Sequence, residues 1–416
     1  MTTSMSLRPF ARVWFCYFAA MGAFALYAPL WFRELGLSAL AIGSIASLQS
    51  WTRVFAPYGW AWLADRSDAR AQFGAEPRGF AARFSPLGRP DRLMRLAGVL
   101  CVVFALALAL AGRFGAAAVS ACVALLFVAN GAVIPLMEAS LAHHLNLAAG
   151  GGAGGRYGRA RVWGSVGYMA AALLFGALLN ALGIAAWPWL VLLLWGLLAW
   201  SLRHLPLGNE PTQHDKAPAG AWDVLRRPEV AWLFAGIFLT VLAHVSLYAF
   251  FSLFAASFGM SESAIGLLWS VGVVVEIGFF WTQGRWFDRL SMHNWLLLAA
   301  GVSALRFAAM AAFGHWMAVL VLTQMTHAIT FAAQHAACIT LVSRYFPGPL
   351  RGRGQALYTT LGYGASGVIG GVAGGALIER WGYSAVFWAS SGAAVLSVLC
   401  LVRSRRHATQ ARLMPA

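Results

Sequence analysis

The residues of this chain that could do chemistry are a few ionisable side chains inside long apolar stretches of sequence. A charged group in such surroundings costs about 2.5–3.5 kcal/mol on membrane-insertion scales and needs a partner or a water-filled cavity. Arginine can bind a carboxylate there through two parallel hydrogen bonds, and glutamate or histidine can take up and release a proton. The ionisable residues placed in this way are Arg53, Glu138, Arg161, His244, Glu276, Arg306, His327 and His335.

The apolar stretches are long enough to cross a lipid bilayer, which requires about 20 mostly apolar residues. Hydrophobic residues make up 60% of the 416-residue chain and charged residues 11%, against about 45–50% and about 25% in an ordinary soluble domain. This composition excludes a cytosolic enzyme, a secreted module and a disordered protein. The first stretch is too long for the core of a secretory signal, so we expect a retained helix. The predicted spans are 11–32, 39–63, 93–112, 117–140, 159–181, 186–204, 229–256, 262–284, 291–312, 316–340, 354–378 and 383–402.

The net charge of +16 indicates how the spans are oriented. If both termini are cytoplasmic, 24 of the 30 Lys and Arg residues fall in cytoplasmic segments and three lie within the spans. Only Arg33, Arg113 and Arg380 fall on the outer side. This is the positive-inside distribution, and it predicts a multi-pass protein of the cytoplasmic (inner) membrane, with the lipid bilayer as its surroundings. Because the basic residues recur in short patches between apolar runs, no nucleic-acid partner is expected.

A polar segment with several prolines, residues 205–228, divides the chain into two sets of six predicted helices. We expect an N-terminal bundle at 1–204, a cytoplasmic linker at 205–228, and a C-terminal bundle at 229–416 that ends in a short basic tail. Two halves of six helices each favour an all-α transporter fold with internal pseudo-repeats over a receptor or a channel.

The two predicted halves carry matching dipeptides after their second helix. These are Asp65-Arg66 and Asp288-Arg289, and we expect them to form a turn motif that acts in gating. A glycine-rich run at 150–155 lacks the Gly-Lys-Ser/Thr ending of a phosphate-binding loop and follows no strand, so we interpret it as a flexible cytoplasmic hinge.

Several segments of the chain resemble one family of membrane transporters. They are residues 61–66 (AWLADR), 157–165 (YGRARVWGS), 269–276 (WSVGVVVE) and the stretch from 306 to 327. The first resembles the helix 2–3 signature of the major facilitator superfamily, with Ala61 in place of the usual glycine. The others resemble the 3-phenylpropionate permease family, relatives of the lactose permease and other proton symporters. One departure is Thr330, which stands where the lactose permease has an acid one turn after its helix-10 histidine.

The buried charges indicate the kind of substrate and the residues that contact it. Three arginines inside the spans face two glutamates, and this excess of positive charge favours an anion such as a carboxylate. The resemblance implies an aromatic acid, on whose ring aromatic side chains could stack. We assign substrate binding to Arg306, Arg53, His244, Trp269 and Tyr27, and proton coupling to Glu276, Glu138, Arg161 and His327.

Each assignment has a structural alternative. Arg161 could extend to the membrane surface instead of pairing with Glu138, and Arg53 could brace the turn after the second helix. Glu276 and Arg306 could form a static salt bridge that fixes helix packing. His335 could serve packing or a cytoplasmic gate, and most aromatic residues could belong to the core or to the interfacial belt.

The sequence therefore predicts a secondary active transporter that imports a small organic anion together with a proton by alternating access. We expect a functional monomer that uses a proton gradient and has no cofactor, metal or catalytic residue. A proton-coupled exporter of drugs or metabolites, or a symporter of a neutral sugar or nucleoside, is the alternative. A membrane-embedded enzyme is disfavoured because the long loops at 65–92 and 205–228 contain no catalytic constellation.

Overall fold

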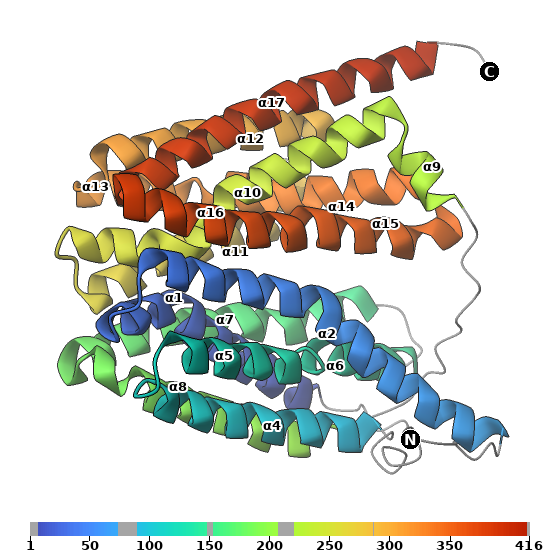
Figure 1. The fold of residues 1–416 in the computed structure, drawn as a ribbon. Coiled ribbons are helices and arrows are strands. Elements are labelled where there is room, and N and C mark those ends of the chain that lie inside the picture. Colours follow the sequence, from blue (N-terminus) through green and yellow to red (C-terminus); the bar gives the residue numbers. More distant parts are fainter. Residues whose placement is uncertain (1–6, 74–89, 148–152, 207–219, 286, 414–416) are drawn as a thin grey trace. The chain divides into compact units, whose positions relative to one another are not determined.

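The computed structural model describes residues 7–73, 90–147, 153–206, 220–285 and 287–413, and these segments are almost entirely helical (Figure 1). No strand occurs among them. Eleven of the helical stretches are long and apolar enough to cross a membrane. The twelfth predicted span lies in α2 (Ala39–Phe73), which is long enough but less hydrophobic. Gln49, Arg53 and several serines account for this difference.

The chain divides into two compact units. One comprises residues 1–35 and 52–214, and the other comprises 36–51 and 215–416. The first part of α2 therefore groups with the C-terminal helices, whereas the predicted boundaries assign it to the N-terminal bundle. The predicted linker at 205–228 lies largely outside the described residues, and its role stays a prediction.

The first unit is built around α1 (Arg8–Glu34), which packs against α7 and α8. The indole of Trp187 is fully buried beside α1, where its Nε1 donates to the carbonyl of Ala23 at 3.0 Å and its ring packs against Trp31 and Phe24. The other helices are α4 (Pro90–Ala111), α5 (Ala116–Asn130), α6 (Val133–Leu147), α7 (Ala153–Leu182), the short η2 (Ile184–Ala186) and α8 (Trp187–Arg203).

The predicted span over 117–140 is interrupted. It consists of α5 and α6, separated by a turn at Gly131 and Ala132. Pro135 in the first turn of α6 explains the break, because proline has no N–H to continue the α-helical hydrogen bonding and its ring displaces the carbonyl four residues earlier.

After the first part of α2, the second unit continues with α9 (Ala221–Leu225) and α10 (Pro228–Ser257), and α10 packs against α16 and α17. Hydroxyl pairs join α10 to α17, Thr240 with Ser397 at 2.6 Å and Ser246 with Ser390 at 2.5 Å. The other elements are α11 (Glu262–Thr282), η3 (Gln283–Arg285), η4 (Phe287–Arg289), α12 (Met292–Phe313), α13 (Met317–Met325), η5 (Ala328–Ala333), α14 (Gln334–Tyr345), η6 (Gly348–Leu350), α15 (Arg351–Leu357), η7 (Tyr358–Ala365), α16 (Ser366–Trp381) and α17 (Tyr383–Leu413).

Two helices of the second unit contain π-helical segments. The predicted span 316–340 is α13, η5 and α14 in sequence, and the span 354–378 lies within α15, η7 and α16. In a π-helix each backbone hydrogen bond reaches one residue further than in an α-helix, and such segments are frequent at functional sites. Here they change which side chains share a face, at His327 in one helix and at Tyr358 and Tyr363 in the other.

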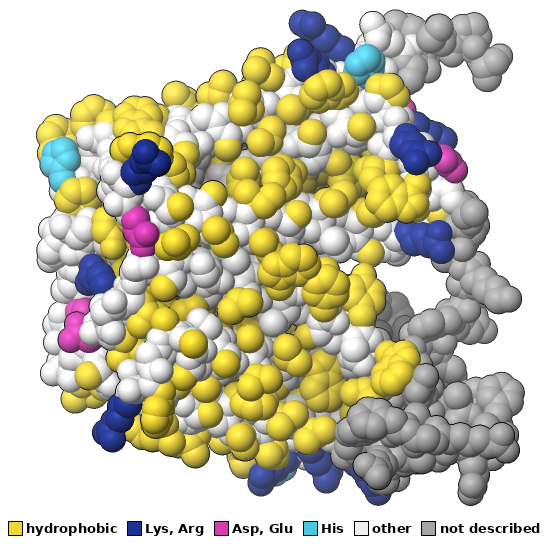
Figure 2. Space-filling view, viewed as in Figure 1, with side chains coloured by type: hydrophobic (Ala, Val, Ile, Leu, Met, Phe, Trp, Pro, Cys, Tyr) yellow, Lys and Arg dark blue, Asp and Glu magenta, His cyan; other side chains and the backbone are white. Residues whose placement is uncertain are grey.

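Large apolar side chains are exposed along the outside of both units. Trp281 is 86% exposed, Leu305 74% and Leu174 61%. Exposing such apolar side chains is unfavourable in water but not in lipid. On the face seen in Figure 2, hydrophobic side chains make up most of the described surface, and the charged side chains lie mainly near helix ends. This surface is the one that a bilayer requires.

The packing of α1 on α7 predicts that Gly167 cannot be enlarged. A Cβ at Gly167 would overlap backbone atoms of Phe15, which cannot turn aside as a side chain can. We expect Gly167→Ala to destabilise the protein by about 1–3 kcal/mol, the usual cost of overpacking. Thermal unfolding in detergent measures this, with Gly196→Ala as the control because a Cβ at Gly196 meets no atom within 4 Å. Equal unfolding temperatures for the two variants would contradict the packing described.

Candidate functional site

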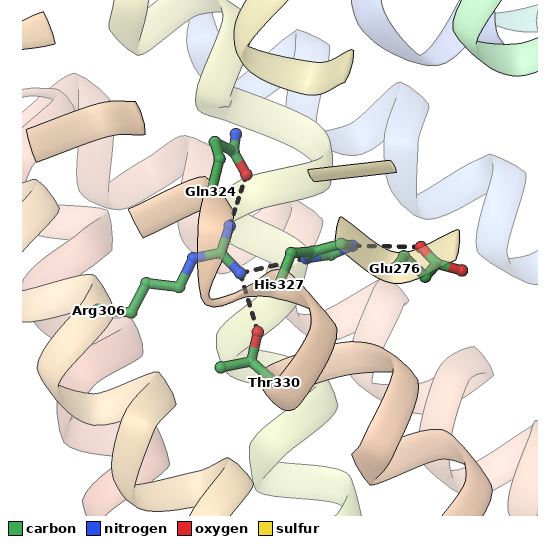
Figure 3. Close-up of polar contacts among 5 residues, drawn as sticks. All are labelled: Glu276, Arg306, Gln324, His327 and Thr330. Carbon is green, nitrogen blue, oxygen red and sulfur yellow. Dashed lines mark hydrogen bonds and ion pairs between the residues drawn. The ribbon is translucent and has the colours of Figure 1, made fainter. Parts of the chain in front are cut away.

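The most unusual group in the second unit is the guanidinium of Arg306, which is buried in the interior of α12 with 2% of the residue exposed. Its Nη1 donates to the hydroxyl of Thr330 at 2.9 Å and to Nδ1 of His327 at 3.2 Å, and its Nη2 donates to Oε1 of Gln324 at 2.7 Å (Figure 3). Gln324 in α13, His327 just before η5 and Thr330 in η5 therefore all face the same residue of α12.

The contact with Arg306 determines the protonation of His327. A guanidinium only donates hydrogen bonds, so Nδ1 of His327 must accept and the ring proton must be on Nε2. Nε2 in turn lies 3.9 Å from Oε2 of Glu276 on α11. The imidazole therefore stands between the cation and the carboxylate, as Figure 3 shows. The side chain of Glu276 is 24% exposed, so it is the more accessible end of this chain of groups.

Three buried nitrogens around Arg306 have no hydrogen-bond partner in the described part of the chain: Arg306 Nε, Gln324 Nε2 and His244 Nε2. The first two are donors. His244 donates from Nδ1 to the carbonyl of Thr240 at 2.8 Å, which leaves Nε2 as an acceptor in the neutral ring. Because an unmet buried polar atom costs about 1–3 kcal/mol, such atoms indicate a place that a polar ligand or water completes.

Aromatic rings border the polar groups. Tyr248 of α10 stacks on Trp269 of α11 with ring centroids 6.2 Å apart, and it meets His327 edge to face at 6.4 Å. The indole of Trp269 is fixed by a hydrogen bond from Nε1 to the hydroxyl of Ser252 at 3.3 Å. Phe331 stacks on His327 with centroids 5.2 Å apart. The arrangement combines flat apolar faces with a buried cation.

The predicted residues of the C-terminal half meet in this cluster, although not through the pairing considered from the sequence. A direct salt bridge between Glu276 and Arg306 was one alternative, and His327 lies between them instead. Thr330, noted only as a departure from the lactose permease, is a direct partner of Arg306. Gln324 was missed. A buried amide three residues before His327 in an apolar span is the signal that could have found it.

The predicted residues of the N-terminal half lie in the first unit. The guanidinium of Arg161 stands over the rings of Trp14 and Phe18, 4.6 and 4.4 Å from their centroids, a cation–π arrangement. Glu138 is exposed and accepts a hydrogen bond from the hydroxyl of Tyr157 at 3.2 Å.

Arg53 and the two dipeptide motifs have simpler surroundings. Arg53 is exposed on α2. Asp65 and Arg66 lie within the helical backbone of α2, and their side chains are outside the described part of the structure. The helix continues to Phe73, ten residues beyond the predicted end of that span. Asp288 and Arg289 form the short η4 after α11. The gating role of these four residues stays a prediction.

Comparison with known proteins agrees with this architecture. The sequence matches the MFS_1-like family over residues 7–389. It is 28% identical over 411 residues to the maltose permease of Geobacillus stearothermophilus, covering 94% of this chain and 93% of that protein. It is 31% identical over 238 residues to a probable 3-phenylpropionic acid transporter of Escherichia coli (strain K12), covering 56% of this chain and 61% of that protein.

Solved structures of transporters share the fold. The nucleoside transporter NupG superposes with a TM-score of 0.78 at 15% identity, covering 96% of this chain and 99% of that one. The POT family transporter PepTSo gives a TM-score of 0.71 at 12% identity, covering 97% and 98%. At these identities the likeness concerns the fold alone.

The apolar outer surface and the helical architecture are those of a multi-pass membrane protein, and the family match and the two permease relatives show a transporter of a small substrate. The chain belongs to the MFS_1-like family of the major facilitator superfamily, a family of transporters and not a class of enzymes. The predicted fold class and the resemblance to 3-phenylpropionate permeases are confirmed.

The surroundings of Tyr27 lead to a prediction about its role. This residue is fully buried, and its hydroxyl donates to the carbonyl of Ala172 at 2.5 Å, which favours a packing role between α1 and α7 over substrate contact. We expect Tyr27→Phe to lower stability by about 0.5–1.5 kcal/mol, the usual contribution of one hydrogen bond, and to leave substrate affinity unchanged. Unfolding and ligand-binding measurements on the same detergent preparation check this. Weakened binding at unchanged stability would support the substrate role predicted for Tyr27.

Proposed function

We propose that this protein imports a small organic carboxylate, such as an aromatic acid similar to 3-phenylpropionate, together with a proton. It would work in the cytoplasmic (inner) membrane as a monomer with both termini cytoplasmic, by alternating access between the two sides. The proton gradient would supply the energy, so no cofactor or metal takes part. The substrate's carboxylate would bind at Arg306, and Glu276 would carry the proton.

The observation that carries this proposal is the set of partners around Arg306. The guanidinium is buried, yet the described groups that accept its hydrogen bonds are an amide, a hydroxyl and a neutral imidazole. The carboxylate of Glu276 is held beyond His327. A buried cation that lacks an anionic partner is stabilised strongly by a carboxylate, and Nε of Arg306 offers a donor that is still unmet.

The neighbouring rings support an aromatic substrate. Tyr248, Trp269 and Phe331 present flat faces beside the polar cluster. An aromatic ring gains about 0.5–1.5 kcal/mol from such stacking beyond the burial of its area. The similarity to a probable 3-phenylpropionic acid transporter supports the same substrate class.

Proton coupling follows from competition for Arg306. When a substrate carboxylate accepts the hydrogen bond that Nη1 now donates to His327, Nδ1 of the imidazole becomes able to accept a proton. The pair formed by His327 and Glu276 then binds one proton more than before, because a charged imidazole beside a carboxylate is no longer opposed by the arginine. Substrate binding and proton binding therefore favour each other. Glu138 with Arg161 in the first unit is the second candidate for this role.

A substrate panel in proteoliposomes tests the anion site. We expect an inward proton gradient to drive accumulation of labelled 3-phenylpropionate, but not of maltose or uridine. Arg306→Lys keeps the charge and loses the planar fork, so it should weaken 3-phenylpropionate binding by about tenfold or more. Arg403→Lys is the matched control, because that arginine lies over Trp232 at the far end of α17. Unaltered affinity in Arg306→Lys would contradict the carboxylate site.

The role of Glu276 leads to a separate prediction. Glu276→Gln keeps the size and polarity of the side chain but cannot release a proton. We expect it to abolish accumulation driven by the proton gradient while exchange of labelled for unlabelled 3-phenylpropionate across the membrane continues. Glu262→Gln, in the first turn of α11, is the control. Uptake that depends on the gradient equally in Glu276→Gln and in the wild type would rule out Glu276 as the proton carrier.

A neutral sugar is the second candidate substrate, and the similarity to maltose permease over 94% of the chain favours it. Accumulation of maltose, with no response to 3-phenylpropionate, would establish this alternative. An exporter would instead deplete the vesicle interior when the gradient is reversed, so the same preparation determines the direction of transport.

A further inference from the structure

A second polar cluster lies in the second unit, apart from the contacts of Arg306. Nδ1 of His335 on α14 is 2.9 Å from the hydroxyl of Tyr358 and 3.2 Å from that of Tyr363, both on η7. The two hydroxyls are 3.2 Å apart. The three polar atoms thus form a closed triangle in which each is within hydrogen-bonding distance of the other two.

The triangle is set in an apolar environment. Tyr358 is 3% exposed and belongs to a cluster of buried hydrophobic side chains that includes Ala337, Leu341 and Ile237. The titratable groups that act on it are few among the described residues. The Cys338 thiol is a hydrogen-bonding neighbour of Tyr358, and Glu276 of α11 acts electrostatically on Tyr363.

The triangle can hold His335 in either charge state without losing a hydrogen bond. With the neutral ring, the Tyr358 hydroxyl donates to Nδ1 and the Tyr363 hydroxyl donates to Tyr358. With a proton on Nδ1, the Nδ1–H donates to Tyr363, Tyr363 still donates to Tyr358, and the Tyr358 hydroxyl turns from Nδ1 to the sulfur of Cys338. A hydroxyl both donates and accepts, which makes this change possible.

His327 has no such freedom while Arg306 donates to it. A proton on its Nδ1 would place two cations 3.2 Å apart in a buried site. Of His327 and His335, His335 is therefore the one whose Nδ1 could take a proton without standing beside a cation, because its described hydrogen-bonding neighbours are two hydroxyls.

The two histidines are aligned along the helix. The rings of His327 and Phe331 are parallel within 1°, and those of Phe331 and His335 within 6°. The π-helical segment η5 produces this alignment, because it turns more slowly than an α-helix and keeps residues spaced by four on one side. The segment η7 brings Tyr358 and Tyr363 to the same polar atom although five residues separate them.

We propose that His335, Tyr358 and Tyr363 form a second proton site, which binds a proton during the transport cycle. A hydronium ion that reaches His335 gives one proton to Nδ1 and leaves as water, while the Tyr358 hydroxyl turns away from Nδ1. His335 becomes an imidazolium, and both tyrosines keep their hydroxyl protons. The proposal rests on the proton-coupled function proposed above.

His335→Gln tests this site in proteoliposomes. Accumulation of labelled 3-phenylpropionate under an inward proton gradient should fall by about tenfold or more, because a proton-transfer step is lost. Exchange of labelled for unlabelled 3-phenylpropionate at equal pH on both sides moves no net proton and should change by less than about twofold. The dependence of uptake on external pH should also flatten.

Two further variants separate proton transfer from packing. Tyr363→Phe keeps the ring and removes the hydroxyl, so it should slow gradient-driven accumulation and leave exchange intact. His315→Gln, an exposed histidine between α12 and α13, should behave as the wild type. Full accumulation by both His335→Gln and Tyr363→Phe would overturn the proposal, as would a loss of exchange that parallels the loss of accumulation. Wild-type protein that exchanges 3-phenylpropionate but ignores the gradient would instead overturn the proton-coupled function itself.

Discussion

The second unit depends on one electrostatic constraint, a guanidinium held inside an apolar helical bundle. Removing the charge of Arg306 from water is expensive, and its position is tolerable only because three acceptors from one neighbouring helix surround it. Those acceptors are neutral, so they satisfy the hydrogen bonds but leave the charge in place. In the proposed function, a substrate carboxylate would neutralise this charge.

The rest of the unit positions these acceptors. Serine and threonine hydroxyls join α10 to α17, and the first part of α2 packs on α16, where the hydroxyl of Ser47 donates to the carbonyl of Val368 at 2.8 Å. Such contacts need close backbone approach, and Gly43 and Gly371 provide it because a Cβ on either would overlap the other helix. The π-helical segments η5 and η7 then rotate the polar residues toward common partners. Irregular helices are therefore concentrated where the polar chemistry is.

Comparison with relatives places this chemistry in a known superfamily without fixing the substrate. A maltose permease and a probable 3-phenylpropionic acid transporter are both similar to this chain, and the two substrates named differ in charge. The surroundings of Arg306 bear on this difference in charge. A sugar has only hydroxyl groups, whereas a carboxylic acid supplies an anion, which the described partners of Arg306 do not. The deciding chemistry thus lies in a few buried contacts and not in the overall likeness.

The sequence by itself determined the helical architecture, because length, hydropathy and the proline and serine residues at helix starts are local properties. It also identified Glu276, Arg306 and His327 as the residues to examine, since charge inside an apolar span is conspicuous. Only the tertiary structure decided that His327 separates the other two, that Thr330 and Gln324 complete the site, and that His335 joins two tyrosines. These pairings depend on the rotation of each helix about its axis. An apolar helix with little amphipathic pattern does not encode that rotation, and the π-helical segments change it further.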